Sequence, residues 1–325
     1  MFTLAIIGAG QLGSRHLQAL ARLSLPCQID VVDPSPQSLE IARQRFDEMP
    51  PNAAIREVRY HSTIDALPRS LDYVIVATTA NVRLRVIEAL LNHASITSIL
   101  LEKVLFQRAD EYALALQLLE SHRVRAWVNC VNRVFPIYAE ISKFFATESL
   151  RYFQVRGGDW GLGCNSIHYL DILGMLTNAL PELISTLDLD RTLVSSKRKN
   201  YQEFTGVLRG KYAGGIEFEI ASFAASSARL QLIFRSENRT CVFDERSGAA
   251  AFFKSEDDCG WECKKFKMPY LSETGTMVAT QILSEGTCAL PTFEQSTAYH
   301  LPLIRALGTH AAACNGTSSD ICPIT

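Results

Sequence analysis

Two short segments of the sequence carry side chains that can bind a hydroxyl oxygen and move its proton. Glu102-Lys103 directly follows an apolar run, and a lysine ammonium there can hydrogen bond an oxygen and favour its ionised form. At about 100° per residue around a helix, one polar arc contains Cys164, Asn165, His168 and Asp171. An imidazole is a natural acceptor for a hydroxyl proton near neutral pH, and Asp171 at i+3 can orient His168. These segments predict acid–base chemistry at a hydroxyl-bearing carbon.

Each of these residues also has a structural interpretation, which the sequence leaves open. Lys103 can be a surface cation in an ion pair, and Asn165 can be the N-cap of the helix. His168 and Asp171 can be structural partners. Trp160, just before the helix, can stack on a sugar face or pack within its loop. The residues expected to contact a polar substrate are Lys103, Arg133, Trp160, Asn165 and His168.

The elements that must position these side chains begin with a glycine motif near the N-terminus. An apolar run at residues 2–7 leads at once into Gly8-Ala9-Gly10-Gln11-Leu12-Gly13, followed by a helical pattern and a second apolar run. The first glycine permits the tight turn, the second admits a pyrophosphate to the backbone, and the third allows close helix packing. Amide groups at the helix start then face the anion. The expected pyrophosphate contacts are Gly8, Gly10, Gln11 and Leu12.

Asp33, which ends the second apolar run, indicates the type of dinucleotide. It lies 20 residues after Gly13, where an acid binds the hydroxyls of the adenosine ribose. A carboxylate accepts hydrogen bonds from a diol but repels a 2′-phosphate, and no arginine follows Asp33 before Arg43. The pattern therefore predicts NAD as the cofactor and disfavours NADP. Further contacts to the dinucleotide are expected at Thr78, Thr79, Asn81 and Glu102.

Strand and helix patterns alternate along residues 1–128, which predicts a parallel sheet with right-handed crossovers. Four candidate site residues fall just beyond predicted strands, at the edge where open α/β sheets bind ligands: Gly8, Asp33, Thr78 and Lys103. This Rossmann domain is expected to hold the cofactor.

Residues 129–325 have a different pattern. A helix is expected at 165–177 and a helical tail at 296–313, while the chain between them is mainly strands, with Gly214-Gly215 as a hairpin turn. The predicted fold class is therefore α/β, with an N-terminal Rossmann parallel sheet followed by an α+β domain that has a large, mainly antiparallel open sheet. The second domain is expected to supply the substrate side and an oligomer interface.

The composition suits a soluble globular protein with two domains. The chain has 325 residues, 47% apolar content and a net charge of −2, which gives no electrostatic footprint for nucleic acid or an acidic membrane surface. No apolar run approaches the roughly 20 residues of a membrane span. Nine cysteines without an export signal indicate reduced thiols in the cytoplasm. Cys259 and Cys263 have metal-ligand spacing, but no second pair completes a tetrahedral site, so no metal is expected.

The chain resembles the glucose–fructose oxidoreductase, inositol 2-dehydrogenase and rhizopine-catabolism (Gfo/Idh/MocA) family of NAD(P)-dependent oxidoreductases over most of its length. The resemblance implies a Rossmann domain, an α/β domain with an open sheet, frequent dimers or tetramers, and Lys103 with His168 as the proton-handling pair. The chain differs from the family at Cys164, where an acid is usual, and at Val104, where a cis-proline is usual. The motifs that carry the resemblance are the glycine motif, Ala77-Thr78-Thr79, Glu102-Lys103-Val104, Val131-Asn132-Arg133 and His168-x-x-Asp171.

The residues and the resemblance together predict an NAD-dependent dehydrogenase or reductase. It would move a hydride between nicotinamide and the carbinol or carbonyl carbon of a sugar, sugar nucleotide or polyol, in the setting of bacterial surface-sugar metabolism. Lys103, His168 and Asp171 are the predicted catalytic residues. Two alternatives are an NAD-assisted glycoside hydrolase or lyase and a non-catalytic dinucleotide-binding or sensing protein, which Cys164 favours. We expect a carbohydrate ligand, no nucleic-acid or membrane partner, and a homodimer or homotetramer formed through the C-terminal sheet.

Overall fold

The computed structural model describes residues 1–255, 260–317 and 321–325, and the chain divides into two compact units. The first unit contains Met1–Phe106, Asp110–Val131 and Pro269–Ser296, and the remaining described residues form the second. A division of the chain at residue 128 would leave α7 (Leu271–Glu285) in the second domain, whereas this helix packs on α1 (Gln11–Leu20) of the first unit. No helix among the described residues is long and apolar enough to cross a membrane.

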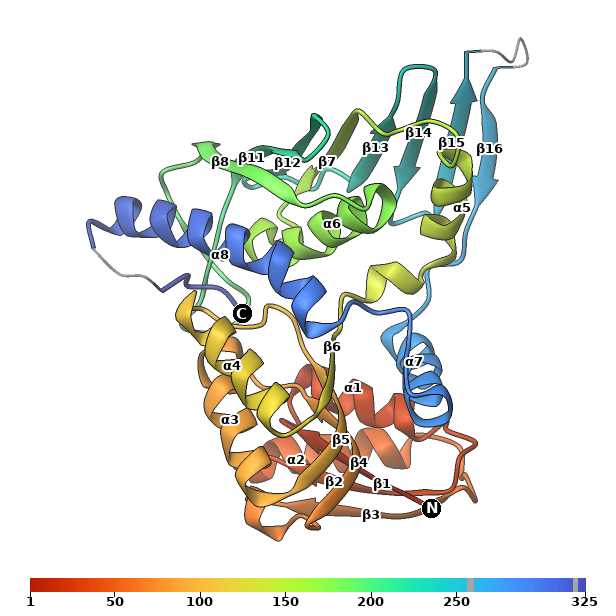
Figure 1. Ribbon diagram of the computed structural model, residues 1–325, viewed down its shortest axis with the longest axis vertical. Helices are drawn as coiled ribbons and strands as arrows, with labels where there is room; N and C mark the ends of the chain where they lie inside the picture. The colour runs from red at the N-terminus through yellow and green to blue at the C-terminus, as the bar shows by residue number, and fades with distance from the viewer. Residues whose placement is uncertain (256–259, 318–320) are drawn as a thin grey trace. The chain divides into compact units, whose positions relative to one another are not determined.

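The first unit is built on a parallel six-stranded sheet in the order β3-β2-β1-β4-β5-β6 (Figure 1). The order reverses between β1 and β4, as in a Rossmann fold, so the prediction of this fold is confirmed. Besides α1 and α7, its elements are β1 (Phe2–Ile7), β2 (Cys27–Val32), α2 (Pro36–Asp47), β3 (Ile55–His61), β4 (Ser70–Val76), α3 (Ala80–His93), β5 (Ser95–Leu101), α4 (Asp110–Ser121) and β6 (Arg125–Val128).

The strands of this sheet form because their apolar runs are covered on both faces. Leu4, Ala5 and Ile6 of β1 are fully buried, as a central parallel strand between helices requires. The start of α2 follows from local sequence, since Ser35 accepts a hydrogen bond from the amide of Ser38 at 3.2 Å and a proline occupies the first turn.

The second unit is built on an eight-stranded sheet in the order β16-β15-β14-β13-β7-β12-β11-β8. Every pair is antiparallel except β7 with β12, so the predicted mainly antiparallel sheet is confirmed. Its strands are β7 (Tyr152–Gly158), β8 (Pro181–Leu189), β11 (Gly206–Tyr212), β12 (Ile216–Phe223), β13 (Gln231–Arg235), β14 (Arg239–Asp244), β15 (Ala249–Lys254) and β16 (Glu262–Lys265), and a separate pair is β9 (Val194–Ser195) with β10 (Gln202–Glu203).

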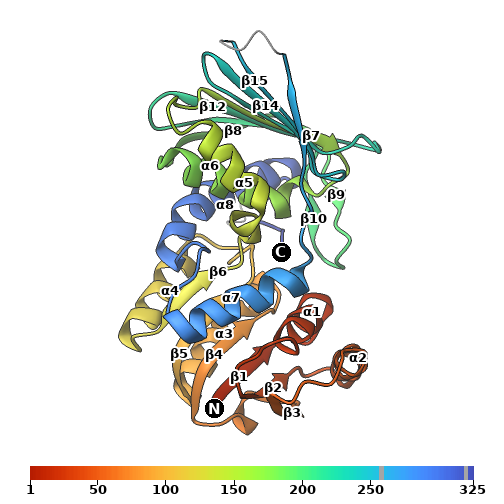
Figure 2. The same ribbon diagram turned by 90° about the vertical axis from the view of Figure 1, so that its right-hand side faces the viewer.

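Helices cover one face of this sheet (Figures 1 and 2). They are α5 (Pro136–Phe144), α6 (Leu162–Thr177) and α8 (Phe293–Asn315), of which α8 begins within the first unit. Among the described residues no helix lies on the opposite face, which carries ion pairs instead. There Glu219 is bound by Arg156 at 2.9 Å and by Arg209 at 3.0 Å. The sheet is therefore open, as predicted.

Several boundaries of the second unit differ from the sequence prediction. The predicted hairpin at Gly214-Gly215 is confirmed, with φ values of 85° and 77°. The helix predicted from Asn165 begins three residues earlier, at Leu162, with Gly161 as its N-cap, so Asn165 is not the cap. The tail helix also begins earlier than predicted, at Phe293. Cys259, half of the pair considered for a metal, lies outside the described residues.

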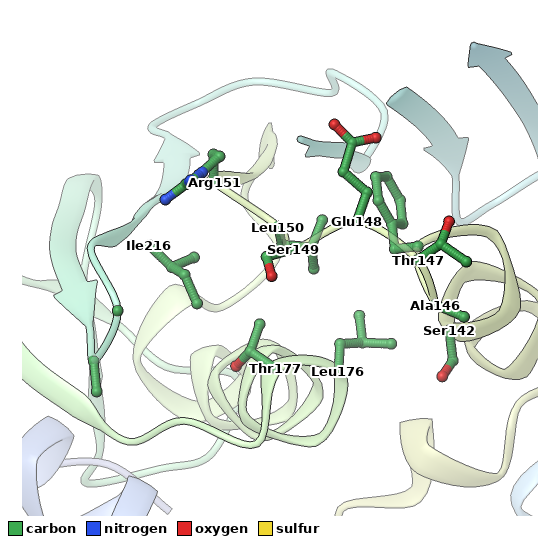
Figure 3. Close-up of a pocket in the computed structure, with 13 residues that line it drawn as sticks. Ser142, Ala146, Thr147, Glu148, Ser149, Leu150, Arg151, Leu176, Thr177 and Ile216 are labelled. Carbon is green, nitrogen blue, oxygen red and sulfur yellow. The ribbon is translucent and has the colours of Figure 1, made fainter. Parts of the chain in front are cut away.

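A hollow of about 630 Å³ opens in the second unit between the end of α5 and the end of α6 (Figure 3). Ser149, Thr177 and Ile216 border it, with Glu148 and Arg151 at its rim. Thr177 is the last residue of α6, nine residues after His168, which places the hollow about 13 Å further along the helix. This hollow is therefore separate from the polar arc of α6.

Candidate functional site

The glycine turn of the first unit has the backbone geometry that an anion-binding turn requires. Gly8 has a φ of 94°, and a Cβ at Gly13 would overlap the carbonyl oxygen of Gly8. Above Gly10 the space is open, since no heavy atom lies within 4 Å of where its Cβ would be. No side chain caps α1, whose N-cap is Gly10. The amide groups at the start of α1 therefore border a cradle that a phosphate group fits.

Asp33 lies beside this cradle and joins two turns. Its carboxylate accepts hydrogen bonds from the amides of Ala9, at 2.7 Å, and Ser35, at 2.8 Å. Its own amide donates to the carbonyl of His61, the last residue of β3. The side chain is half-buried. The carboxylate is thus held at the end of β2, where the sequence predicted a contact to the ribose.

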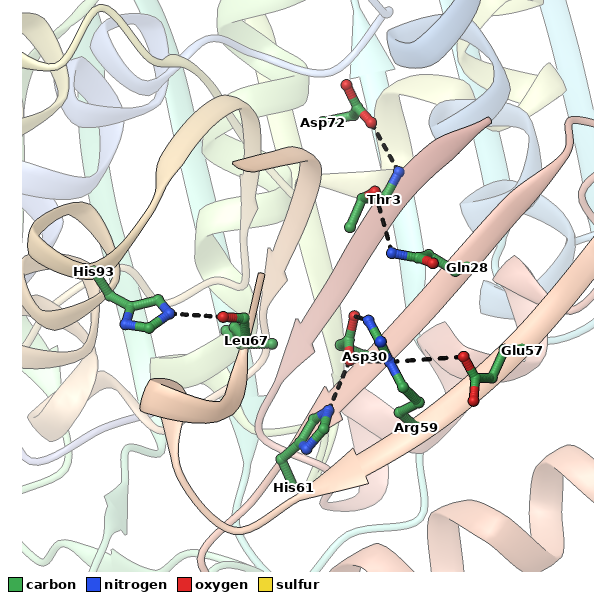
Figure 4. Close-up of polar contacts among 9 residues, drawn as sticks. All are labelled: Thr3, Gln28, Asp30, Glu57, Arg59, His61, Leu67, Asp72 and His93. Atoms are coloured by element: carbon green, nitrogen blue, oxygen red, sulfur yellow. Dashed lines mark hydrogen bonds and ion pairs between the residues drawn. The ribbon is translucent and has the colours of Figure 1, made fainter. Parts of the chain in front are cut away.

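The edge strand that ends next to Asp33 is fixed by a buried carboxylate (Figure 4). Asp30 of β2 is fully buried, and both its oxygens bind Arg59 of β3, at 2.9 and 2.8 Å. His61 adds a third hydrogen bond of 2.7 Å. A buried carboxylate needs such partners, and here they hold β3 in register beside β2.

The turn after β4 carries the predicted contacts Thr78, Thr79 and Asn81. The hydroxyl of Thr78 is buried and has no hydrogen-bond partner among the residues that the structure describes. The hydroxyl of Thr79 donates to the side-chain oxygen of Asn81 at 2.7 Å. Buried Arg83 of α3 donates to the carbonyl of Thr78 and to two carbonyls of the chain after Lys103. One guanidinium therefore holds together the loops that follow β4 and β5.

Lys103 follows β5 and is half-buried, and the residue before it, Glu102, is a buried carboxylate with two hydrogen-bond partners. Glu102 is 3% exposed and accepts hydrogen bonds from His16 at 2.6 Å and Asn129 at 2.7 Å. Burial raises the pKa of this carboxyl, but the hydrogen bonds of His16 and Asn129, with the charges of His16 and Lys103, outweigh it and lower the pKa of Glu102 to about 2. The Lys103–Val104 peptide bond is cis. Glu102 is therefore an ionised anchor beneath the lysine, with no exposed face for a dinucleotide.

The first unit thus fits a dinucleotide at its topological switch point. The open space over Gly10, the uncapped helix start and the buried hydroxyl of Thr78 lie beyond the carboxyl ends of β1 and β4. Ligands of open α/β sheets bind in the crevice at that edge. The residues that would hold the pyrophosphate and ribose are those predicted from the sequence: Gly8, Gly10, Gln11, Leu12 and Asp33.

In the second unit, α6 presents the predicted polar arc in a mixed state of burial. Cys164, Asn165 and His168 are half-buried, whereas Ile167 and Leu170 on the packing side are fully buried. The side-chain amide of Asn165 donates to the carbonyl of Trp160 at 2.9 Å. Three polar side chains in the first two turns of α6 therefore remain accessible within this unit.

Asp171, the fourth member of the arc, is fully buried and belongs to an ion pair. Arg133 binds both its oxygens, at 2.7 and 2.8 Å. Burial raises the pKa of the Asp171 carboxyl to about 6, although the hydrogen bonds and charge of Arg133 act to lower it. The two oxygens that were expected to orient His168 are thus bound to Arg133, and the guanidinium expected to meet substrate is bound to Asp171.

The start of α6 is held by an acid that the sequence analysis missed. Glu203 of β10 is 8% exposed, and its two oxygens accept hydrogen bonds from the amides of Gly163, at 2.8 Å, and Cys164, at 3.3 Å. A carboxylate is favoured there because the helix dipole places positive charge at the N-terminus. The carboxylate that the family usually has at Cys164 is thus absent from α6, but another carboxylate contacts the same backbone position.

A second missed acid lies on the other side of the arc. Glu245, just after β14, accepts a hydrogen bond of 2.6 Å from the hydroxyl of Tyr169. Burial raises the pKa of Glu245, while the hydrogen bond from Tyr169 lowers it. The Trp160 ring packs edge-on against Tyr169 with centroids 5.5 Å apart, and its indole N–H donates to the carbonyl of Ala221 at 2.8 Å. Packing within the unit therefore accounts for the position of Trp160.

Metal ligands are not grouped in the part of the chain that the structure describes: no set of three or more His, Cys, Asp or Glu side chains is arranged to hold an ion. The eight described cysteines are free, and Cys263, at the edge of the sheet, is exposed.

Fold and site together define a dinucleotide-binding α/β protein with a Rossmann unit and an open-sheet unit. Residues 2–130 match the family model described as "Oxidoreductase family, NAD-binding Rossmann fold". The Rossmann part of the chain is therefore similar to the Gfo/Idh/MocA oxidoreductase family. We found no curated protein that matches the sequence.

Solved structures share the fold of the whole chain at low sequence identity. UDP-N-acetylglucosamine 3-dehydrogenase GnnA from Acidithiobacillus ferrooxidans is 15% identical, with a TM-score of 0.74 over 94% of this chain and 96% of that one. An oxidoreductase from Agrobacterium radiobacter, in complex with NAD+, L-tartaric acid and magnesium, is 14% identical with a TM-score of 0.74 over 97% of each chain. The super-repressor mutant of Gal80p from Saccharomyces cerevisiae is 12% identical with a TM-score of 0.71 over 96% of each chain. The same fold thus occurs in dehydrogenases and in a repressor.

Proposed function

We propose that the protein is an NAD-dependent dehydrogenase or reductase that acts on a CH–OH or carbonyl group of a sugar, sugar nucleotide or polyol. The observation that carries the proposal is the difference in burial between Lys103 and His168 and the carboxylates near them in sequence. Lys103 and His168 are each half-buried, and each has a buried, hydrogen-bonded carboxylate close to it in sequence: Glu102 before the lysine and Asp171 one turn after the histidine. A frame of this kind suits groups that must be held in place but reach a ligand.

In the proposed reaction, the glycine turn and Asp33 would hold the dinucleotide, which would supply a hydride acceptor for the carbinol carbon or, when reduced, a hydride donor for the carbonyl carbon. His168 takes the hydroxyl proton as the carbon–oxygen bond gains double-bond character, and it gives a proton back in the reverse direction. The ammonium of Lys103 binds the same oxygen and stabilises the negative charge that develops there. Asp171 acts through Arg133 as a positioning residue for α6, and Glu102 positions Lys103.

NAD rather than NADP is the proposed cofactor because of Asp33. Its carboxylate is held at the end of β2 by two backbone amides, so it cannot easily move away from a 2′-phosphate. Arg43, the first arginine after it, lies over the ring of Tyr60 with 4.5 Å between guanidinium carbon and ring centroid. The guanidinium of Arg43 is therefore assigned to Tyr60 and not to a 2′-phosphate.

Two further features are proposed together with the activity. The open face of the eight-stranded sheet is the proposed interface of a homodimer or homotetramer, in line with the frequent dimers and tetramers that the family resemblance implies. A reducing compartment such as the cytoplasm suits the nine cysteines of the chain.

The test begins with NAD and a panel of polyols, sugars, sugar phosphates and sugar nucleotides, with the absorbance of reduced nicotinamide as the readout. Lys103→Ala and His168→Ala should each lower kcat by roughly 100-fold or more while NAD binding is retained. Lys143→Ala and His122→Ala are matched controls, because both side chains are exposed. Unchanged turnover in both site variants would remove the mechanism.

The same panel separates the alternatives. An NAD-assisted lyase or hydrolase would convert substrate without a lasting change in nicotinamide absorbance. A dinucleotide sensor would bind NAD and a sugar without turnover, and the occurrence of this fold in a repressor keeps that alternative in the test. The presence of both Lys103 and His168 favours the dehydrogenase.

A further inference from the structure

The hairpin of β9 and β10 carries the densest group of cations in the second unit. Residues 191–202 contain four basic side chains and no acid, in a chain with a net charge of −2. All four are exposed, and none forms an ion pair with any residue that the structure describes. They are Arg191, Lys197, Arg198 and Lys199. By contrast, Arg133, Arg156 and Arg209 of this unit are bound to carboxylates.

The tip of this hairpin is a defined turn. The amide of Ser196 donates to the carbonyl of Tyr201 at 3.0 Å, and the amide of Tyr201 donates to the carbonyl of Arg198 at 3.3 Å. The amide of Arg198 donates to the hydroxyl of Ser196. Lys197, Arg198 and Lys199 are therefore carried on an internally bonded loop, which keeps three positive charges close together.

The base of the hairpin is fixed to the start of α6. Glu203 binds the amides of Gly163 and Cys164, and the amide of Gln202 donates to the carbonyl of Pro323 at 2.8 Å. Figure 2 shows β10 beside the C-terminal end of the chain. The cationic tip is thus attached to the helix turn that carries the accessible part of the polar arc.

Chain geometry limits how far the cations lie from this arc. Lys199 is four residues from Glu203, so even a fully extended chain places it within about 15 Å. His168 is one helical turn beyond Cys164, or about 6 Å along the axis. These values are upper limits, and an extended sugar phosphate or sugar nucleotide with its sugar at His168, met by the long side chains of lysine and arginine, has a comparable reach.

We infer that Lys197, Arg198 and Lys199 bind the phosphate or diphosphate group of the substrate, so that the substrate class is a phosphorylated sugar or a sugar nucleotide. The inference rests on the proposed function, since it assigns the substrate of that site. Clustered ammonium and guanidinium groups suit a phosphate because each forms charge-assisted hydrogen bonds with its oxygens. Nucleic acid is a poorer match, because the cations are confined to one turn of an otherwise slightly acidic chain.

Binding can be measured without turnover, which separates this inference from the proposed function. The probes are UDP, inorganic pyrophosphate, glucose 6-phosphate and glucose, titrated calorimetrically into the full chain with NAD saturating. NAD must be present because its own pyrophosphate site would otherwise accept the probes. At low salt, UDP and at least one other phosphate probe should bind, and glucose should bind more weakly. Raising the salt should weaken the phosphate probes.

The decisive variant is the triple substitution Lys197→Ala, Arg198→Ala and Lys199→Ala. It should weaken UDP and pyrophosphate at least tenfold and leave the Kd of NAD unchanged. The control removes three exposed cations elsewhere in the unit: Lys143→Ala, Lys265→Ala and Arg305→Ala. Because both variants change the net charge equally, a loss confined to the hairpin variant supports a specific site.

Four results would overturn the inference while leaving the dehydrogenase assignment intact. The first is equal UDP affinity in the hairpin variant and the wild type. The second is a hairpin variant that loses NAD affinity, since the cations would then serve the cofactor. The third is a short oligonucleotide that binds more tightly than UDP and is lost with the same three cations. A wild type that turns over unphosphorylated sugars as well as phosphorylated ones would also contradict it.

Discussion

The two units hold their candidate site residues in different ways. In the first, the cradle for the cofactor is made mainly by backbone within one short motif, because the contact that requires a glycine at position 13 is with the carbonyl of Gly8 in the same turn. In the second, two residues of the polar arc of α6 are held by partners far away in sequence: Glu203 binds the amide of Cys164, and Arg133 binds Asp171. A motif formed by local backbone can be predicted from the sequence, whereas contacts between side chains that are distant along the chain cannot.

The largest effect that would sharpen this comparison is expected from Gly13→Ala. The added Cβ overlaps the carbonyl oxygen of Gly8, so the turn must open. Overpacking of this kind should cost about 3 kcal/mol or more of the free energy of unfolding. It should also weaken NAD binding by roughly 100-fold, because the helix amides no longer converge on the pyrophosphate. Urea unfolding and calorimetric titration with NAD measure the two effects.

Gly10→Ala provides the matched control in the same turn. No atom lies near its added Cβ, so stability should change little, while NAD binding should still weaken because the methyl group occupies the space of the pyrophosphate. If Gly13→Ala and Gly10→Ala gave the same stability, the close packing of α1 on the turn would not be the reason for the glycine at position 13.

A smaller effect is expected from Glu102→Gln. This substitution tests whether the stability of the first unit also depends on contacts between residues that are distant in sequence. The folded pKa of about 2 lies below the value near 4.3 of an unfolded glutamate. The ionised carboxylate therefore stabilises the folded state above about pH 5, and this contribution disappears as the pH falls towards 2. Near pH 7 the substitution should cost roughly 2–3 kcal/mol.

The measurement is the difference in the free energy of urea unfolding between wild type and Glu102→Gln from pH 7 down to pH 3. That difference should shrink as the pH is lowered. Glu57→Gln is the control, since Glu57 is exposed and lies in an edge strand of the same sheet. A difference that did not depend on pH would mean that folding does not lower the pKa of Glu102.

The sequence predicted the elements that rest on periodicity and on local turns. The parallel sheet could be inferred because strands alternate with helices in the first unit, and the open antiparallel sheet because strands follow one another without helices in the second. The Gly214-Gly215 turn could be inferred because glycine permits positive φ. The contacts to the cofactor remain predictions, since the glycine motif indicates which residues would bind the dinucleotide but not how tightly they bind it.

The remainder could not be predicted because its partners are distant along the chain. His16 and Glu102 are 86 residues apart, and Tyr169 and Glu245 are 76 residues apart. No periodicity connects such positions. The sequence did contain one signal for Arg83, since it is a charged residue within an otherwise apolar helix face. It did not indicate which three carbonyls, in two loops, the guanidinium would bind. The start of α6 was placed too late for the same reason, since the carboxylate that binds the amide of Gly163 in its first turn is 40 residues further on.

The smallest expected effect tests the carboxylate of Glu203, which binds two amides in the first turn of α6. Glu203→Gln keeps the shape of the side chain but removes the charge that interacts with the helix dipole and the two amides. It should therefore cost about 1 kcal/mol of stability, and Glu203→Ala, which also removes the hydrogen bonds, about 2 kcal/mol. Hydrogen exchange should show faster exchange for the amides of Gly163 and Cys164 in both variants, with the larger change in Glu203→Ala. Glu217→Gln is the control, because its carboxylate is exposed on β12 and binds Lys211. Unchanged exchange at both amides in Glu203→Ala would show that Gly161 alone sets the start of α6, and the second unit would then resemble the first in relying on local backbone.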